Sequence, residues 1–81
     1  MELKDTIEMM TSSDYRERFV AEYRQLQIRV RKLHRVIRDG KNGKLDFKPD
    51  CPLKVLKKQE SMMNQYLRVL EERAEIEGID L

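Results

Sequence analysis

The sequence is poor in the residues that build disulfides, metal sites and catalytic centres. It has one Cys, one His, no Trp, two Pro and three Gly among 81 residues. Cys51 cannot form an internal disulfide, and one His with one Cys supplies too few ligands for a zinc site. Gly40 and Gly43 belong to a turn sequence and not to a phosphate-binding loop. We therefore expect a protein that is not an enzyme, with no catalytic residues, no metal and no cofactor.

Long apolar runs are also missing. No stretch approaches the roughly 20 apolar residues that span a bilayer. The first ten residues, MELKDTIEMM, lack the basic start and apolar core of a signal peptide. We expect a cytoplasmic protein that does not contact a membrane.

The sequence is instead rich in charge and in helical periodicity. Charged residues make up 40% of the chain and aromatic residues only 6%, a balance typical of long helices. Between Asp14 and Asp39, apolar residues recur at steps of four and three. They are Phe19, Tyr23, Leu26, Val30, Leu33 and Ile37. This seam predicts a helix that packs against another helix, with Val20, Ile28 and Val36 left at the surface.

A second long helix is predicted after the turn. Asp50 or Cys51 is expected to cap it, Pro52 to lie in its first turn, and Gly78 with Ile79 to end it in a Schellman motif. One apolar stripe matches the seam and consists of Leu53, Leu56, Met63, Leu67, Leu70 and Ala74. The other lies roughly 100° or more around the helix and consists of Val55, Met62, Tyr66, Val69 and Ile76. The second stripe predicts a contact with another subunit, with the N-terminal helix, or with both.

These patterns predict an all-α fold with one domain spanning residues 1–81. Helices are expected at about 2–10, 14–39 and 51–77, as a short N-terminal helix followed by a long antiparallel hairpin. A core of this size stabilises a chain by only about 3–5 kcal/mol, so we expect a helical-bundle oligomer. We also expect Asp39-Gly40 and then Asn42-Gly43 to end the central helix. Leu45 and Phe47 are expected to cover the end of the core, and all three tyrosines to lie in the core.

Charge is unevenly distributed along the chain. Between Arg24 and Lys58, twelve basic residues face three acidic ones, a balance of +9, whereas the rest of the chain carries −7. In an antiparallel hairpin the basic residues gather toward the loop end and predict an anion site. Its candidate residues are Arg24, Arg31, Arg35, Arg38, Lys54, Lys57 and Lys58. The alternative is that these side chains only offset the dipole of the first long helix.

The sequence resembles a family of small helical-hairpin proteins encoded by tailed phages and prophages, including crAss-like phages. The similar parts are the RF-x-x-EY-x-QL block at residues 18–26, CPL at residues 51–53 and LEERAEIEGIDL at residues 70–81. The resemblance implies a helical hairpin and a phage setting, and it implies no active site. Short phage genes often encode inhibitors of bacterial immunity.

Three functions agree with these features. The first is an oligomeric anti-defence protein that binds an anionic ligand, such as a cyclic nucleotide used as an immune signal. The second is a protein inhibitor that binds a host defence or CRISPR effector protein. The third, an accessory nucleic-acid-binding protein, would show binding that weakens steeply with salt.

Overall fold

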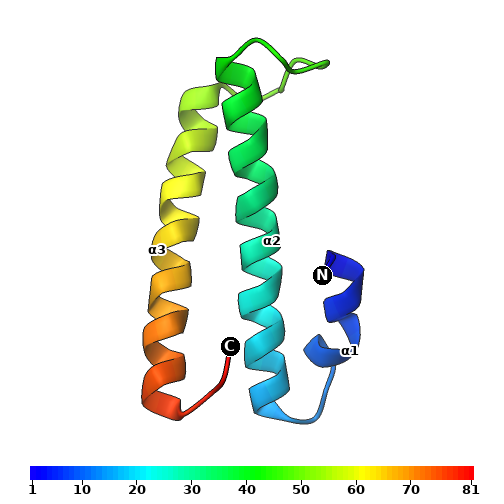
Figure 1. Ribbon diagram of the computed structural model, residues 1–81, viewed down its shortest axis with the longest axis vertical. Coiled ribbons are helices and arrows are strands. Elements are labelled where there is room, and N and C mark those ends of the chain that lie inside the picture. Colours follow the sequence, from blue (N-terminus) through cyan, green and yellow to red (C-terminus); the bar gives the residue numbers. More distant parts are fainter.

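The computed structural model describes all 81 residues, which form helices and connecting loops without strands. A short N-terminal segment contains a 3-10 helix, η1 (Leu3–Thr6), and one turn of α-helix, α1 (Ile7–Met10). Two long helices follow, α2 (Tyr15–Lys41) and α3 (Leu53–Glu77). Figure 1 shows α2 and α3 running antiparallel along a molecule of 43 × 24 × 16 Å. The predicted all-α fold, a short N-terminal helix before a long helical hairpin, is confirmed.

The seam predicted on α2 forms the core of the hairpin. It packs against the first apolar stripe of α3 in a cluster of Phe19, Tyr23, Leu26, Val30, Leu70, Ala74 and Ile79. Leu70 is only 1% exposed, so its truncation to Ala costs about 2–5 kcal/mol of stability. Ile79 reaches the core because Gly78, at φ 68°, reverses the chain and the Ile79 N–H donates to the Ala74 carbonyl at 2.8 Å. The predicted Schellman end of the second helix is confirmed.

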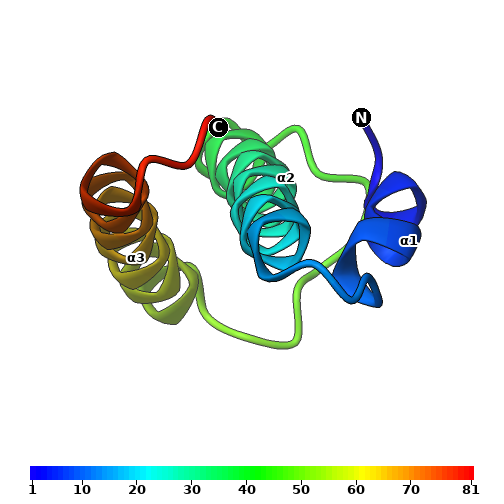
Figure 2. The same ribbon diagram turned by 90° about the horizontal axis from the view of Figure 1, so that it is seen from below.

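The N-terminal segment packs on α2 and not on α3. Figure 2 shows α2 in the middle, with α3 on one side and α1 on the other, and both η1 and α1 contact α2 alone among the long helices. Ala21 and Ile28, seven residues apart, lie on the face of α2 opposite the seam, and both are buried. The expectation that Ile28 is a surface residue is wrong, because this face of α2 packs beneath the N-terminal segment.

Of the two expected ends, Asp39-Gly40 does not end the central helix, which continues to Lys41 and has Asn42 as its C-cap residue. A Cβ atom added at Gly40 would lie 3.0 Å from a methyl group of Leu53 and 3.2 Å from one of Leu45. The glycine is therefore needed for close packing where the loop and α3 approach α2. The turn itself uses Gly43, whose φ of 66° lies in the left-handed region.

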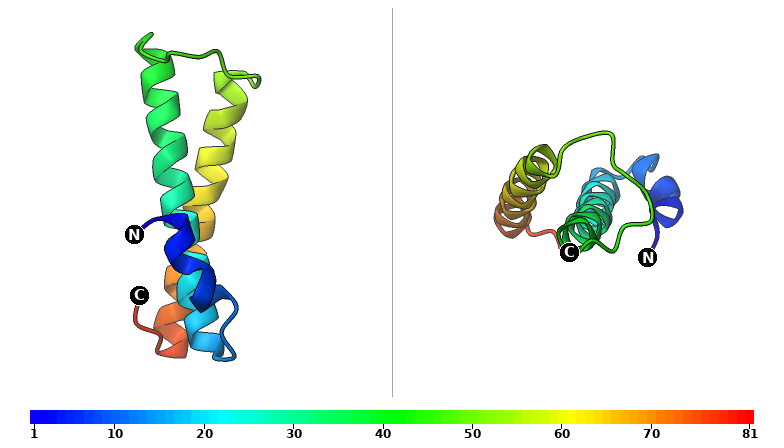
Figure 3. Two further views of the ribbon diagram at one scale, coloured as in Figure 1. Left: turned by 90° about the vertical axis from the view of Figure 1, so that its right-hand side faces the viewer. Right: turned by 90° about the horizontal axis from the view of Figure 1, so that it is seen from above.

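The loop covers less of the core than expected. Leu45 is partly buried beside Gly40, but Phe47 is 55% exposed, so its predicted role as a core plug is wrong. Figure 3 shows the loop swinging past α2 toward the side of the N-terminal segment before it returns to α3. Phe47 lies along this path and lines an open groove with Lys32, Val36 and Lys44.

The two long helices begin differently. At α2, the Asp14 carboxylate caps the helix by accepting from the Arg16 N–H at 2.9 Å. The Asp14 N–H donates to the Ser12 hydroxyl at 3.0 Å, and not to the Glu17 side chain as it would in a capping box. At α3, Pro52 is itself the N-cap residue and no side chain caps the helix. The predicted capping by Asp50 or Cys51 is therefore wrong.

The second apolar stripe of α3 has no partner within the chain. Val55, Met62, Tyr66, Val69 and Ile76 are all exposed, from 45% at Val55 to 77% at Ile76. The N-terminal segment lies beyond α2 and cannot cover them. Of the two coverings expected from the sequence, only a contact with another molecule remains.

Candidate anion-binding site

The arginines predicted to bind an anion share one face of α2. Arg24, Arg31, Arg35 and Arg38 are spaced by seven, four and three residues, which keeps them on one side of a helix. At a rise of about 1.5 Å per residue, however, Arg24 lies roughly 21 Å from Arg38 along the axis. The four side chains therefore form a stripe and not a single cluster at the loop end.

The middle of this stripe lines an open groove of about 620 Å³. Arg31, Lys32 and Arg35 of α2 supply its positive charge, and none of the three makes an ion pair. One wall comes from Glu60 and Asn64 of α3, while Met1 and Glu2 supply another part of the lining. The volume lies in the range of about 300–1,000 Å³ that small-molecule sites occupy. We call this space the central groove.

The central groove is mixed in charge. Besides its three cationic side chains it contains the carboxylates of Glu2 and Glu60. Glu60 is held in place because one of its oxygens lies 2.6 Å from Nδ1 of His34 on α2. The groove therefore offers donors for an anion on α2 and acceptors on the facing wall.

A second groove adjoins the central groove at the loop. Lys32 and Arg35 line both, and the second groove, of about 570 Å³, adds Lys44 and the exposed ring of Phe47. The carboxylates of Asp39 and Asp46 also line it. An exposed aromatic ring beside cationic side chains is a combination that can stack a nucleobase next to its phosphate. We call this the loop groove.

A third depression of about 340 Å³ lies between the two helices near the loop end. It is lined by Arg38 and Lys41 of α2 and by Lys57 of α3, and Asn42, His34, Ile37 and Glu60 complete it. Arg38 also forms an ion pair with the neighbouring Asp39 at 3.2 Å. Here the antiparallel hairpin brings basic residues of both helices together, as the sequence suggested.

The seven residues predicted for the anion site are thus divided among several places. Arg31 and Arg35 meet in the central groove, and Arg38 and Lys57 meet near the loop end. The side chains of Arg24, Lys54 and Lys58 line none of the three grooves.

Arg24 has local partners instead. Its guanidinium lies 5.7 Å from the centre of the Tyr23 ring and donates to Gln27 at 3.0 Å. These contacts hold the side chain against its own helix, away from the central groove.

Sequence reasoning missed several lining residues. Lys32, Lys44, Phe47, Glu60 and Asn64 were not among the candidates. The sequence pattern could have identified two of them, because Glu60 and Asn64 are polar, four residues apart and beside the first apolar stripe of α3. The positions of Lys44 and Phe47 depend on the path of the loop, which no periodic pattern encodes.

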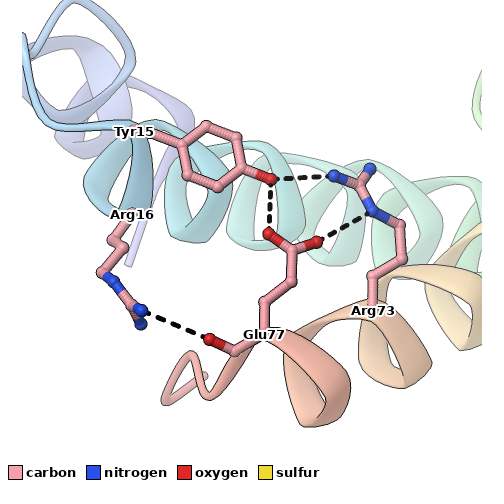
Figure 4. A network of polar contacts seen from close by, with 4 residues as sticks. All are labelled: Tyr15, Arg16, Arg73 and Glu77. Atoms are coloured by element: carbon pink, nitrogen blue, oxygen red, sulfur yellow. Dashed lines mark hydrogen bonds and ion pairs between the residues drawn. The ribbon is translucent and has the colours of Figure 1, made fainter.

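The opposite end of the hairpin carries a polar network (Figure 4). The Tyr15 hydroxyl donates to Glu77 at 2.8 Å and accepts from Arg73 at 2.8 Å, while Arg16 donates to the Gly78 carbonyl at 2.9 Å. The hydrogen bond to Glu77, with partial desolvation, raises the pKa of Tyr15 above its ordinary value, and Arg73 opposes this rise. In this network Glu77 is paired with Arg73 at 3.3 Å, whereas Arg31, Lys32 and Arg35 of the central groove make no ion pair.

The tyrosines are not all in the core. Tyr23 is buried at 6% exposure, but Tyr15 and Tyr66 are about half exposed, so the expectation of three core tyrosines is wrong for two of them. Each hydroxyl instead donates to a glutamate of the other long helix, Tyr23 to Glu71 at 2.7 Å and Tyr66 to Glu22. The hydrogen bond to Glu71, with desolvation, raises the pKa of Tyr23.

No three side chains of the His, Cys, Asp and Glu types lie close enough together to hold a metal ion. Although α2 and α3 are long, both are too polar to cross a lipid bilayer.

The fold and its grooves define a small helical-hairpin protein with unpaired cationic side chains on one face of α2. The chain belongs to the Sequestin family, whose sequence model matches residues 13–76, that is α2, the loop and nearly all of α3. The family name suggests a sequestering role. No curated protein and no solved structure matches the chain.

Proposed function

We propose that the protein is a non-enzymatic anti-defence protein of a phage or prophage, which sequesters a nucleotide second messenger in the cytoplasm of the bacterial host. The match to the Sequestin family supports a protein that withholds a ligand. The similarity of residues 18–26, 51–53 and 70–81 to phage and prophage proteins supports the setting.

The observation that carries this proposal is the convergence in the central groove of Arg31, Lys32 and Arg35, none of which makes an ion pair. Compensation of the helix dipole does not explain this convergence. The dipole effect is confined to the last turn of a helix, and Arg31 lies well before the last turn of α2. Arginine presents a planar fork of donors that suits phosphate oxygens. These three side chains are the proposed phosphate contacts.

The mixed charge of the central groove favours a nucleotide over a bare phosphate. Asn64 offers an amide that can pair with the edge of adenine, and Glu60 offers a carboxylate oxygen that can accept from an exocyclic amine. In the loop groove, Phe47 offers a surface for stacking. A ligand with both phosphates and bases uses all of these groups.

The proposed active form is an oligomer, because the exposed apolar stripe of α3 needs a covering. A chain of 81 residues with eleven buried residues has a small core, which an intersubunit contact would reinforce. Each subunit would then contribute its own α2 grooves to the assembly.

The proposal is tested by titrating cyclic dinucleotides, cyclic trinucleotides and nucleotide-sugar signals into the protein in a calorimeter. We expect at least one of them to bind at micromolar protein or below, and to be recovered unchanged afterwards. Recovery of a hydrolysed product would contradict sequestration without catalysis. Absence of heat with every compound would contradict the proposed ligand class.

A second candidate function is the inhibition of a host defence or CRISPR effector protein. It is favoured by the same exposed stripe of α3, since contiguous apolar surface marks protein contacts. Purification from the host with one stoichiometric host protein, lost in Met62→Glu, would favour it over the nucleotide proposal.

A further inference from the structure

Glu60 of α3 is an acidic residue in the middle of the basic surface. It lines the central groove together with Arg31, and it also lines the third depression together with Arg38. Its side chain is only 20% exposed, and one carboxylate oxygen lies 2.6 Å from Nδ1 of His34. It makes no ion pair with a lysine or an arginine. The carboxylate therefore keeps a negative charge among cations that do not contact it.

We propose that Glu60 makes the central groove selective for phosphates with one negative charge over phosphates with two. This inference rests on the proposed function and specifies the charge class of its ligand. A phosphodiester carries one charge per phosphate, whereas a terminal phosphate monoester carries about −1.5 to −2 at pH 7. Cyclic nucleotides belong to the first class, and AMP, ADP and ATP belong to the second.

The charges that line the central groove nearly balance. Three cationic side chains and the carboxylates of Glu2 and Glu60 leave a net charge of +1 with His34 neutral. A ligand that fills the groove contacts these side chains, well within the Debye length of about 8 Å, so salt screens them only in part. A second negative charge on one phosphate is attracted by the cations and repelled by the carboxylates, and the net gain is small.

The two carboxylates contribute unequally to this balance. The side chain of Glu2 is 73% exposed and lies 3.5 Å from Nζ of Lys4, a cation outside the groove that offsets part of its charge. Glu60 is far less exposed and has no such partner. Because partly buried charges are screened less than exposed ones, Glu60 has the larger effect on the ligand.

Selectivity of this kind suits a sequestering protein. Such a protein has to bind a scarce signal among far more abundant nucleotides that end in a phosphate. A groove lined by cations alone would favour the nucleotide with the most charge, because each charge adds to the attraction. Glu60 reduces this bias, so the bases and the shape of the ligand decide which nucleotide binds.

The test compares adenosine 3′,5′-cyclic monophosphate with adenosine 5′-monophosphate, which share base and sugar and differ by about one charge at pH 8. Titrations followed through the amide resonances of Arg31 and Arg35 give both dissociation constants. Glu60→Gln removes the charge but keeps the size of the side chain and an acceptor for His34. It should shift the ratio of the two constants roughly threefold to tenfold in favour of the 5′-monophosphate, because the doubly charged ligand is relieved of more repulsion.

Glu72→Gln is the matched control. Glu72 is an exposed residue of α3 that lines none of the three grooves, and its substitution changes the net charge of the protein equally. It should leave the ratio unchanged. Glu2→Gln should shift the ratio in the same direction as Glu60→Gln but by a smaller factor. An unchanged ratio in Glu60→Gln, or an equal shift in Glu72→Gln, would overturn the inference.

The proposed function can fail separately. Binding of both adenosine nucleotides with the same ratio in wild type and Glu60→Gln contradicts the selectivity and leaves sequestration intact. A shifted ratio, without calorimetric binding of any cyclic dinucleotide, cyclic trinucleotide or nucleotide-sugar signal, contradicts the proposed ligand class alone. If neither adenosine nucleotide moves the resonances of Arg31 and Arg35 at millimolar concentration, the central groove binds no nucleotide and both proposals are wrong.

Discussion

Tyr23 of α2, whose ring belongs to the core of the hairpin, donates its hydroxyl proton to Glu71 of α3 at 2.7 Å. The same pairing of a tyrosine on one helix with a glutamate on the other recurs at Tyr15 with Glu77 and at Tyr66 with Glu22. Each pair bridges helices that are far apart in sequence. The tyrosines therefore hold the register of the hairpin, so loss of a tyrosine hydroxyl or of its proton should lower the stability of the fold.

Tyr23→Phe should lower the free energy of unfolding by about 1–2 kcal/mol, because it removes a partly buried hydrogen bond to a charged group while the ring still fills the core. Urea denaturation followed by circular dichroism measures the change. Tyr15→Phe is the matched control and should have a smaller effect, since Tyr15 is about half exposed. Equal effects of the two changes would contradict the structural assignment.

Stability should fall at alkaline pH. The pKa values of Tyr15 and Tyr23 are raised above the 10.0 of a free tyrosine, so the folded chain holds these protons more tightly than the unfolded chain. This stabilisation is fully present below pH 10.0 and is lost as the pH rises through the folded-state values. Urea midpoints from pH 8 to about pH 11 measure it. Tyr23→Phe should lose part of the pH dependence, and an unchanged profile would contradict the role of Glu71.

The two faces of α2 should respond differently to an inserted charge. Leu26→Asp places an unpaired carboxylate in the seam and should unfold the hairpin. Ile28→Asp places it beneath the N-terminal segment and should release that segment while α2 and α3 stay folded. Circular dichroism and limited proteolysis distinguish the outcomes. Complete unfolding by Ile28→Asp would show that the segment is required for the hairpin.

The sequence predicted the hairpin because periodic apolar residues and a glycine at the C-terminal turn act locally. The seam from Phe19 to Ile37 faces α3 as expected, and Gly78 with Ile79 ends the second helix as expected. Ile28 was misplaced because the short N-terminal segment has too few residues to show which face of which helix it covers. Phe47 was misplaced because a turn with glycine leaves the path of the following residues open.

The candidate site was less predictable than the fold. The spacing of Arg31 and Arg35 identified part of the central groove, but helix length separated Arg24 from the rest by roughly 21 Å. Glu60 and Asn64 enter the site from the other helix, so their role depends on how α2 and α3 are rotated against each other. That rotation is set by side-chain packing and not by charge pattern.

Phe47 should contribute to base recognition if the loop groove holds part of the ligand. Phe47→Ala should weaken binding of a purine nucleotide roughly tenfold to a hundredfold, because a stacking surface is lost. Binding of ribose 5-phosphate, which has no base, should not change. Phe47→Trp should retain nucleotide binding, and equal losses for both ligands would instead indicate a damaged loop.

The central claim is that unpaired cationic residues of the central groove bind the phosphates of a nucleotide. Calorimetry of Arg35→Ala beside Arg29→Ala tests it most directly, because both arginines are exposed on α2 and only Arg35 lines the grooves. Arg35→Ala should weaken binding of the cyclic nucleotide roughly tenfold to a hundredfold, while Arg29→Ala should match the wild type. Equal affinity of Arg35→Ala and wild type would contradict the account.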